Sequence, residues 1–177
     1  MPGATLWLTG LPCSGKTTIA RSVESALRDR NVRVEVLDGE EIRARLSPDL
    51  GFSRADRDAH IRRLASMADL LSRNGVVAIV AAISPYRAAR DEARQTIGDR
   101  FHEIYVRCPL PVCEQRDVKG FYRLARAGTL HAFTGIDDPY EAPLAPELTL
   151  DTDREGAAAS TERTLELLHR RAIIMPL

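Results

Sequence analysis

The sequence predicts an α/β protein with a five-stranded parallel sheet and helices on both faces of that sheet. Short apolar runs rich in β-branched residues recur along the chain, and segments with apolar residues at every third or fourth position separate most of them. Strands that alternate with helices in this way are typical of a parallel sheet. A third observation is a glycine-rich turn between the first apolar run and the first helical segment.

The expected strands are residues 5–9, 33–37, 76–81, 101–107 and 147–150. The expected helices are residues 16–28, 54–73, 88–96 and 156–171. In the second helix, Ile61, Leu64 and Ala68 recur at helical spacing, so that one face would cover the sheet. Between residues 109 and 146 the pattern breaks into short charged pieces, too long for an ordinary connection. We expect this stretch to form a lid or substrate loops.

Length and charge favour one domain spanning residues 1–177 and a small partner. The chain has 25 Lys and Arg against 25 Asp and Glu, which argues against a nucleic-acid or anionic-membrane surface. The first ten residues resemble neither a signal peptide nor a membrane span. Three cysteines fit no zinc or disulfide spacing and suit a reducing cytosol, so we expect a cytoplasmic protein.

A phosphate-binding motif occupies the glycine-rich turn. Gly10-Leu11-Pro12-Cys13-Ser14-Gly15-Lys16-Thr17, with Thr18 directly after it, matches G-x-x-x-x-G-K-[ST] between a predicted strand and a predicted helix. Backbone N–H groups and the helix N-terminus can hold the phosphates of ATP, Lys16 can reach the β- and γ-phosphates, and Thr17 offers a hydroxyl to Mg²⁺. The alternative, a plain glycine-rich turn, rarely shows the full pattern in this position. For Cys13 we favour a small filler residue over a redox role.

The motif predicts nucleotide binding but leaves the reaction open, because GTPases, motors and small-molecule kinases share it. No segment resembles the guanine-specific N-K-x-D pattern, and the second expected strand runs into Asp38. An acidic residue at the carboxyl end of a neighbouring parallel strand would face the same crevice as the phosphate loop. These observations favour a small kinase.

Further stretches resemble the adenylylsulfate kinase family from the phosphate loop to about Leu150. They include Asp49-Leu50-Gly51-Phe52-Ser53, Ile83-Ser84-Pro85-Tyr86-Arg87, Cys113-Glu114-Gln115-Arg116-Asp117 and Phe133-Thr134-Gly135-Ile136-Asp137-Asp138-Pro139. The resemblance implies a P-loop kinase fold and transfer of a phosphoryl group from ATP to the 3′-hydroxyl of adenosine 5′-phosphosulfate (APS).

The resemblance also implies roles for individual residues. Asp38 would orient or deprotonate the acceptor hydroxyl and hold Mg²⁺ through water, and Arg43 and Arg57 would hold the phosphosulfate. Phe52 and Phe133 would sandwich the acceptor adenine, with a core role as the alternative. The resemblance further implies that Ile83, Ser84 and Lys119 contact the acceptor, that Ser84 and Lys119 also act in catalysis, and that Arg116 stacks on the ATP adenine.

Three residues depart from the family pattern. Glu40 and Glu41 stand where Asp and Asn are common, and His60 stands where an asparagine usually contacts the substrate. These departures leave open an alternative, in which a divergent enzyme phosphorylates another nucleotide or a small alcohol. The family resemblance further implies a homodimer, and association with an ATP sulfurylase stays open.

Overall fold

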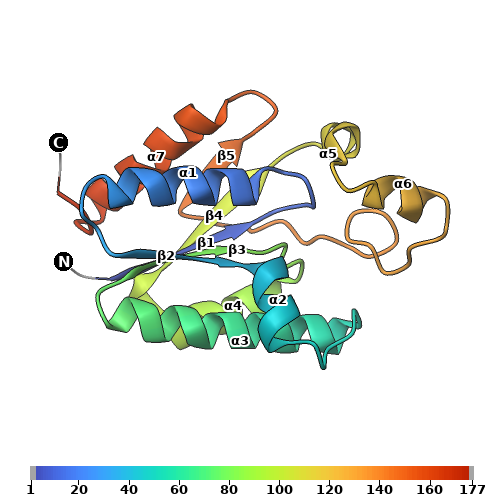
Figure 1. Ribbon diagram of the computed structural model, residues 1–177, viewed down its shortest axis with the longest axis horizontal. Helices are drawn as coiled ribbons and strands as arrows, with labels where there is room; N and C mark the ends of the chain where they lie inside the picture. Colours follow the sequence, from blue (N-terminus) through green and yellow to red (C-terminus); the bar gives the residue numbers. More distant parts are fainter. Residues whose placement is uncertain (1–2, 176–177) are drawn as a thin grey trace.

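The computed structural model describes residues 3–175 and contains a five-stranded, all-parallel sheet (Figure 1). The strands lie in the order β2-β3-β1-β4-β5. Their bounds are Ala4–Thr9 for β1, Val34–Asp38 for β2, Val77–Ala81 for β3, Phe101–Arg107 for β4 and Leu148–Asp151 for β5. The α/β fold class and the five strands predicted from the sequence are therefore confirmed.

Helices cover both faces of the sheet. Figure 1 shows α1 (Lys16–Arg28) and α7 (Ala157–Arg170) on one face, and α3 (Arg54–Arg73) and α4 (Arg87–Ile97) on the other. Alternate residues of β1 point to opposite faces of the sheet. Leu6 therefore packs in the core on the α1–α7 side, and Trp7 packs in the core on the α3–α4 side. Burial of the sheet on both faces explains why its strands are nearly continuous apolar runs.

The sequence does not predict several short elements. Helix α2 (Gly39–Leu46) follows β2 directly, and none of its residues is fully buried, so its sequence carries little apolar periodicity. The stretch expected as a lid contains α5 (Leu110–Arg116) and α6 (Phe121–Arg126), which extend beyond the sheet in Figure 1. A 3₁₀ turn, η1 (Gly98–Arg100), leads into β4. We call residues 109–146 the projecting segment.

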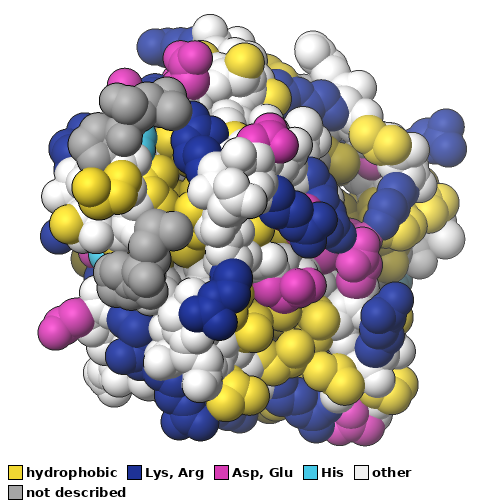
Figure 2. All heavy atoms as spheres, turned by 60° about the vertical axis from the view of Figure 1, so that its left-hand side comes forward, with side chains coloured by type: hydrophobic (Ala, Val, Ile, Leu, Met, Phe, Trp, Pro, Cys, Tyr) yellow, Lys and Arg dark blue, Asp and Glu magenta, His cyan; other side chains and the backbone are white. Residues whose placement is uncertain are grey.

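The end of the chain adds to the core on the α1–α7 side. Ile173 and Ile174 are buried in that cluster, and residues 176–177 lie outside the described structure. Within residues 3–175, every helix is too short or too polar to cross a membrane. On the face drawn in Figure 2, basic side chains lie among acidic and apolar ones, which agrees with the balanced net charge.

Candidate functional site

The carboxyl ends of the parallel strands open onto a cleft of about 1080 Å³. Its walls are the phosphate loop, the β2–α2 junction, the turn after β3, the projecting segment and the loop between β5 and α7. Ligands bind at this edge of open α/β sheets. The cleft brings together most of the predicted site residues, namely Pro12, Cys13, Gly15, Lys16, Thr17, Thr18, Asp38, Arg43, Phe52, Arg57, His60, Ile83, Ser84, Arg116, Lys119 and Phe133.

The phosphate loop wraps around the side chain of Lys16. The Lys16 Nζ atom donates to the carbonyl oxygens of Gly10 at 2.9 Å and Leu11 at 2.6 Å. Burial lowers the pKa of Lys16 from 10.5 to about 8, although neighbouring thiols and carboxylates oppose the shift. The ammonium group is therefore held in the loop with little compensating negative charge.

Three predicted loop residues support the phosphate loop from behind the cleft. A Cβ atom on Gly10 would lie 2.4 Å from the carbonyl oxygen of Val106, so only glycine fits against β4 there. The Leu11 side chain packs on the apolar cluster beneath the projecting segment. Ser14 is buried, and its Oγ atom accepts from Lys16 at 3.4 Å. These residues shape the loop, whereas its other members line the cleft.

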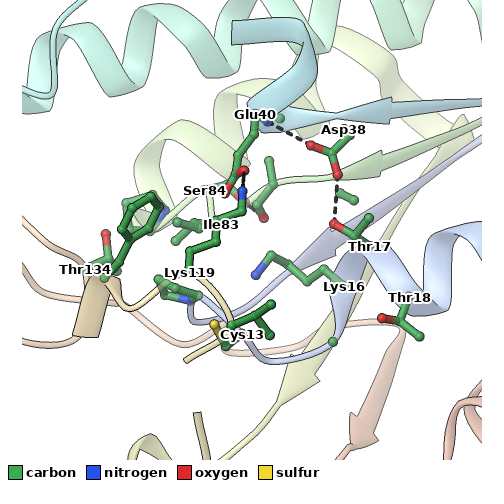
Figure 3. Close-up of a pocket in the computed structure, with 18 of the residues that line it drawn as sticks. Cys13, Lys16, Thr17, Thr18, Asp38, Glu40, Ile83, Ser84, Lys119 and Thr134 are labelled. Atoms are coloured by element: carbon green, nitrogen blue, oxygen red, sulfur yellow. Dashed lines mark hydrogen bonds and ion pairs between the residues drawn. The ribbon is translucent and has the colours of Figure 1, made fainter. Parts of the chain in front are cut away.

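Thr17 and Asp38 meet in front of the loop. The Thr17 hydroxyl donates to Asp38 Oδ2 at 2.8 Å, while Oδ1 accepts from the backbone N–H groups of Glu40 and Glu41 and caps α2 (Figure 3). A hydroxyl and a carboxylate beside a phosphate loop are oxygen ligands of the kind that Mg²⁺ uses together with water and phosphate oxygens. The residues present therefore fit a magnesium ion in this position.

A second cluster of cations and aromatic rings lines the cleft around Phe52. The Phe52 residue is 64% exposed, and the guanidinium carbon of Arg43 lies 4.6 Å from its ring centroid. Arg57 donates to Thr134 Oγ1 at 2.9 Å, and its guanidinium carbon lies 5.9 Å from the same ring centroid. Burial first, and then the positive charge of Arg57, lower the pKa of Arg43. Two guanidinium groups this close together favour an anionic ligand.

Phe133 belongs to both the cleft and the apolar base of the projecting segment. It lines the cleft, and its ring meets the ring of Tyr122 edge to face at a centroid distance of 4.9 Å. Tyr122 in turn donates its hydroxyl to the carbonyl oxygen of Pro12 at 2.9 Å. The projecting segment is thus fastened to the phosphate loop beside an aromatic ring expected to hold the acceptor.

The acidic departures from the family pattern make ion pairs with other side chains. Glu40 pairs with Lys119 of the projecting segment, and Figure 3 shows this contact crossing the cleft from the β2–α2 junction. The hydrogen bond to Glu40 raises the pKa of Lys119. Glu41 pairs with Arg21 on α1 at 3.2 Å. Both carboxylates are therefore already engaged with cations of this chain.

His60 and Ser84 are both buried and both bonded within the protein. His60 Nε2 lies 2.9 Å from the carbonyl oxygen of Gly39, and Nδ1 lies 3.1 Å from the hydroxyl of Ser47, while burial lowers the pKa of the ring. His60 thus joins both ends of α2 to α3. Ser84 is 2% exposed, and its Oγ atom accepts from Trp7 Nε1 at 3.1 Å.

Arg116 connects the projecting segment to the loop between β5 and α7. It donates to the carbonyl oxygen of Thr152 at 2.6 Å, and the Thr152 hydroxyl donates to the carbonyl oxygen of Ser14 at 2.7 Å. Thr152 and Thr134 also line the cleft, although neither is predicted from the sequence as a site residue. Thr152 directly follows β5 and lies two residues after the strand expected at 147–150, so its place at the carboxyl end of a parallel strand could have marked it.

A phosphate loop, a facing carboxylate and a separate cluster of cations around one cleft are the features of a P-loop phosphotransferase. The Adenylylsulphate kinase family model matches residues 2–151. The "Adenylyl-sulfate kinase" of Rippkaea orientalis is 54% identical over 166 residues, covering 94% of this chain and 91% of that protein. The chain therefore belongs to the adenylylsulfate kinase family, as its sequence motifs predict.

Other comparisons agree over nearly the whole chain. The "Adenylyl-sulfate kinase" of Picosynechococcus is 50% identical over 174 residues, covering 98% of each protein. The Mycobacterium tuberculosis APS kinase, solved in complex with AMPPNP and APS, superimposes with a TM-score of 0.92 at 42% identity, covering 96% of this chain and 99% of that one. That relative binds an ATP analogue and APS.

Proposed function

We propose that this chain transfers the γ-phosphoryl group of ATP to the 3′-hydroxyl of APS, giving 3′-phosphoadenosine 5′-phosphosulfate and ADP. The observation that carries this proposal is that two separate cationic regions share one cleft with Asp38. The first is the phosphate loop with Lys16, and the second is formed by Arg43 and Arg57 around Phe52. An acceptor that carries an anionic group and an adenine suits the second region, because arginines bind anions and a phenylalanine ring stacks on a base.

The proposed roles follow from the geometry of these residues. Phosphoryl transfer through a loose transition state depends mainly on positioning and charge stabilisation. Lys16 and the start of α1 hold the transferred phosphate, and Asp38, beside Thr17, orients the acceptor hydroxyl and accepts its proton. Bound Mg²⁺, held by Thr17 and through water by Asp38, would neutralise charge on the phosphates. Lys119 adds positive charge from the projecting segment, which we interpret as the lid.

The arrangement of the three departing residues supports the usual acceptor. Glu40 and Glu41 pair with Lys119 and Arg21, so they leave little free negative charge to repel an anionic acceptor. His60 uses both ring nitrogens on groups of the protein, and burial favours its neutral form. We therefore assign His60 mainly to holding α2 in place.

The setting of the enzyme belongs to the same proposal. We place it in the cytoplasm as a homodimer that takes part in sulfate activation, in line with the family resemblance. Physical association with an ATP sulfurylase extends this proposal. The "Probable bifunctional SAT/APS kinase 2" of Sorangium cellulosum is 49% identical over 168 residues, and the matched region is 29% of that protein.

Turnover with a panel of acceptors tests the proposal. The purified chain is incubated with Mg-ATP and APS, adenosine 5′-phosphate, another 5′-modified adenosine or a small sugar alcohol, and the products are separated by anion exchange. We expect ADP and a 3′-phosphorylated product with APS. A His60→Asn variant, which carries the residue common in the family, is assayed in parallel as the matched control for the effect of His60 on the choice of acceptor. Turnover of another acceptor without turnover of APS would refute the proposal.

A further inference from the structure

Arg90 on α4 is a buried cation outside the residues assigned above. The residue is 2% exposed, and its guanidinium contacts three separate parts of the chain. Nε donates to Glu103 on β4 at 2.7 Å, and the two terminal nitrogens donate to the carbonyl oxygens of Ser84 and Glu141, each at 2.6 Å. A buried charge is tolerated when it is paired and hydrogen-bonded in this way.

The first carbonyl belongs to a turn whose backbone is unfavourable without support. Ser84 has a φ of 41°, in the left-handed region that residues other than glycine rarely adopt. The turn is held from several sides, because Thr9 donates to the carbonyl oxygen of Ile83 at 2.7 Å and Arg90 donates to that of Ser84. Ile83 and Ser84 line the cleft. Arg90 therefore fixes part of the cleft wall from beneath.

The second carbonyl belongs to the end of the projecting segment. Glu141 is fastened to the same turn, since its N–H donates to the carbonyl oxygen of Pro85 at 2.8 Å and its carboxylate accepts from the N–H of Arg87. Further upstream, the projecting segment reaches the cleft at Thr134, which accepts from Arg57. One guanidinium thus joins the turn after β3 to a strap, residues 134–141, that runs back to the acceptor side of the cleft.

We infer that Arg90 is a positioning residue for the acceptor, acting through the Ile83–Ser84 backbone and the 134–141 strap. The guanidinium reaches the carboxylate and the two carbonyl groups through three different nitrogens spread in one plane, whereas a lysine offers a single nitrogen. A lysine at this position keeps the charge beside Glu103 but cannot span both carbonyls. Loss of the fork leaves the hydrogen bonds of Glu141 to Pro85 and Arg87 as the remaining links, so the turn and the strap should both loosen, which weakens acceptor binding and leaves the phosphate loop unchanged.

Arg94, on the same helix, provides the matched control. It donates to both carboxylate oxygens of Glu147, at 2.6 Å and 2.9 Å, and lies 3.7 Å from Glu103. Its ion pairs therefore stabilise the same part of the fold as those of Arg90, while its hydrogen bonds run to the residue before β5 and not to the acceptor turn. An Arg94→Lys variant should lose stability without a specific effect on the acceptor.

Steady-state kinetics of Arg90→Lys and Arg94→Lys separate the two roles. For Arg90→Lys we expect the acceptor KM to rise about tenfold or more while the ATP KM stays within about twofold. For Arg94→Lys both KM values should stay within about twofold at a comparable loss in Tm. Equal effects of the two variants, or an equal rise in both KM values of Arg90→Lys, would overturn the inference. If Arg90→Lys does not fold, Glu103→Gln loosens the same guanidinium and carries the same expectation.

The inference rests on the proposed function only through the acceptor used in these assays. Hydrogen–deuterium exchange supplies a readout that needs no acceptor. In Arg90→Lys, exchange should increase together in residues 82–86 and 134–142, and in Arg94→Lys both stretches should remain as in the parent. Unchanged exchange in either stretch of Arg90→Lys contradicts the inference. Failure of the parent chain to use APS contradicts only the proposed function.

Discussion

The lowered pKa of Lys16 in the free protein predicts that nucleotide binding takes up protons from the buffer in a measurable amount. Burial holds the pKa of Lys16 at about 8, well below its ordinary value, because the ammonium group is enclosed by the phosphate loop. Nucleotide phosphates placed against the same nitrogen favour the charged form, so the pKa rises in the complex. Binding of Mg-ATP should therefore take up a proton, and affinity should fall as the pH rises through about 8.

The expected proton uptake follows from a Lys16 pKa of about 8 in the free protein and a pKa near or above 10.5 in the nucleotide complex. Proton uptake per bound ATP is then about 0.1 at pH 7, about 0.5 at pH 8 and about 0.9 at pH 9. Over the same range the dissociation constant of Mg-ATP should rise about tenfold, which corresponds to about 1.4 kcal/mol. Protons are taken up and not released, because Lys16 has the lower pKa in the nucleotide-free protein and is the more deprotonated there.

Calorimetry without acceptor measures both quantities. Titrations of Mg-ATP at pH 7, 8 and 9 in two buffers of different ionisation enthalpy give the proton uptake from the difference in heat. Lys16→Arg keeps a cation that does not titrate in this range, so its proton uptake should vanish. Cys13→Ser removes a thiol of the same loop and should leave the uptake in place. Equal heats in both buffers at pH 8 would refute the account of Lys16.

Three further substitutions test the carboxylate and the aromatic pair. Asp38→Asn keeps an oxygen that can cap α2, so Tm should hardly change while kcat falls by about 10²- to 10⁴-fold; near-normal kcat would exclude Asp38 as the base. Phe52→Ala should raise the acceptor KM, because stacking contributes about 1–3 kcal/mol per base, and leave Tm unchanged, since Phe52 is exposed. Phe133→Ala should raise the acceptor KM and also lower Tm, because its ring packs on Tyr122. Kinetics and thermal unfolding of each variant check these outcomes.

The sheet and the phosphate loop are predictable because local pattern determines them. Strands buried on both faces leave runs such as Val77–Ala81, and the motif around Lys16 fixes the turn that follows β1. Helices α5 and α6 escape prediction since they are short and charged, and contacts distant in sequence, such as Tyr122 with Pro12, stabilise them. Pattern reasoning is weakest for elements of this kind.

The acceptor side of the site shows the same limit. Resemblance to the family selects Arg43, Arg57 and Phe52, and the structure brings them together. No local pattern, however, shows that Arg90 supports this side of the cleft, because its three partners come from distant parts of the chain. An arginine on an amphipathic helix is expected to face solvent until the tertiary structure is known.

The cations of the cleft differ in their partners and in the direction of their pKa shifts. Lys16 and Arg43 have lowered pKa values, and the former lies in the phosphate loop while the latter lies on the acceptor side. Lys119, which has Glu40 as its partner, has a raised pKa instead. The Lys16 ammonium group is hydrogen-bonded only to uncharged oxygens, and the guanidinium groups of Arg43 and Arg57 share the Phe52 ring, so an anion beside either group would be stabilised, and we expect two separate anion subsites. Two such subsites in one cleft with Asp38 are what transfer from a nucleotide to an anionic acceptor requires, whereas a hydrolase needs only the first.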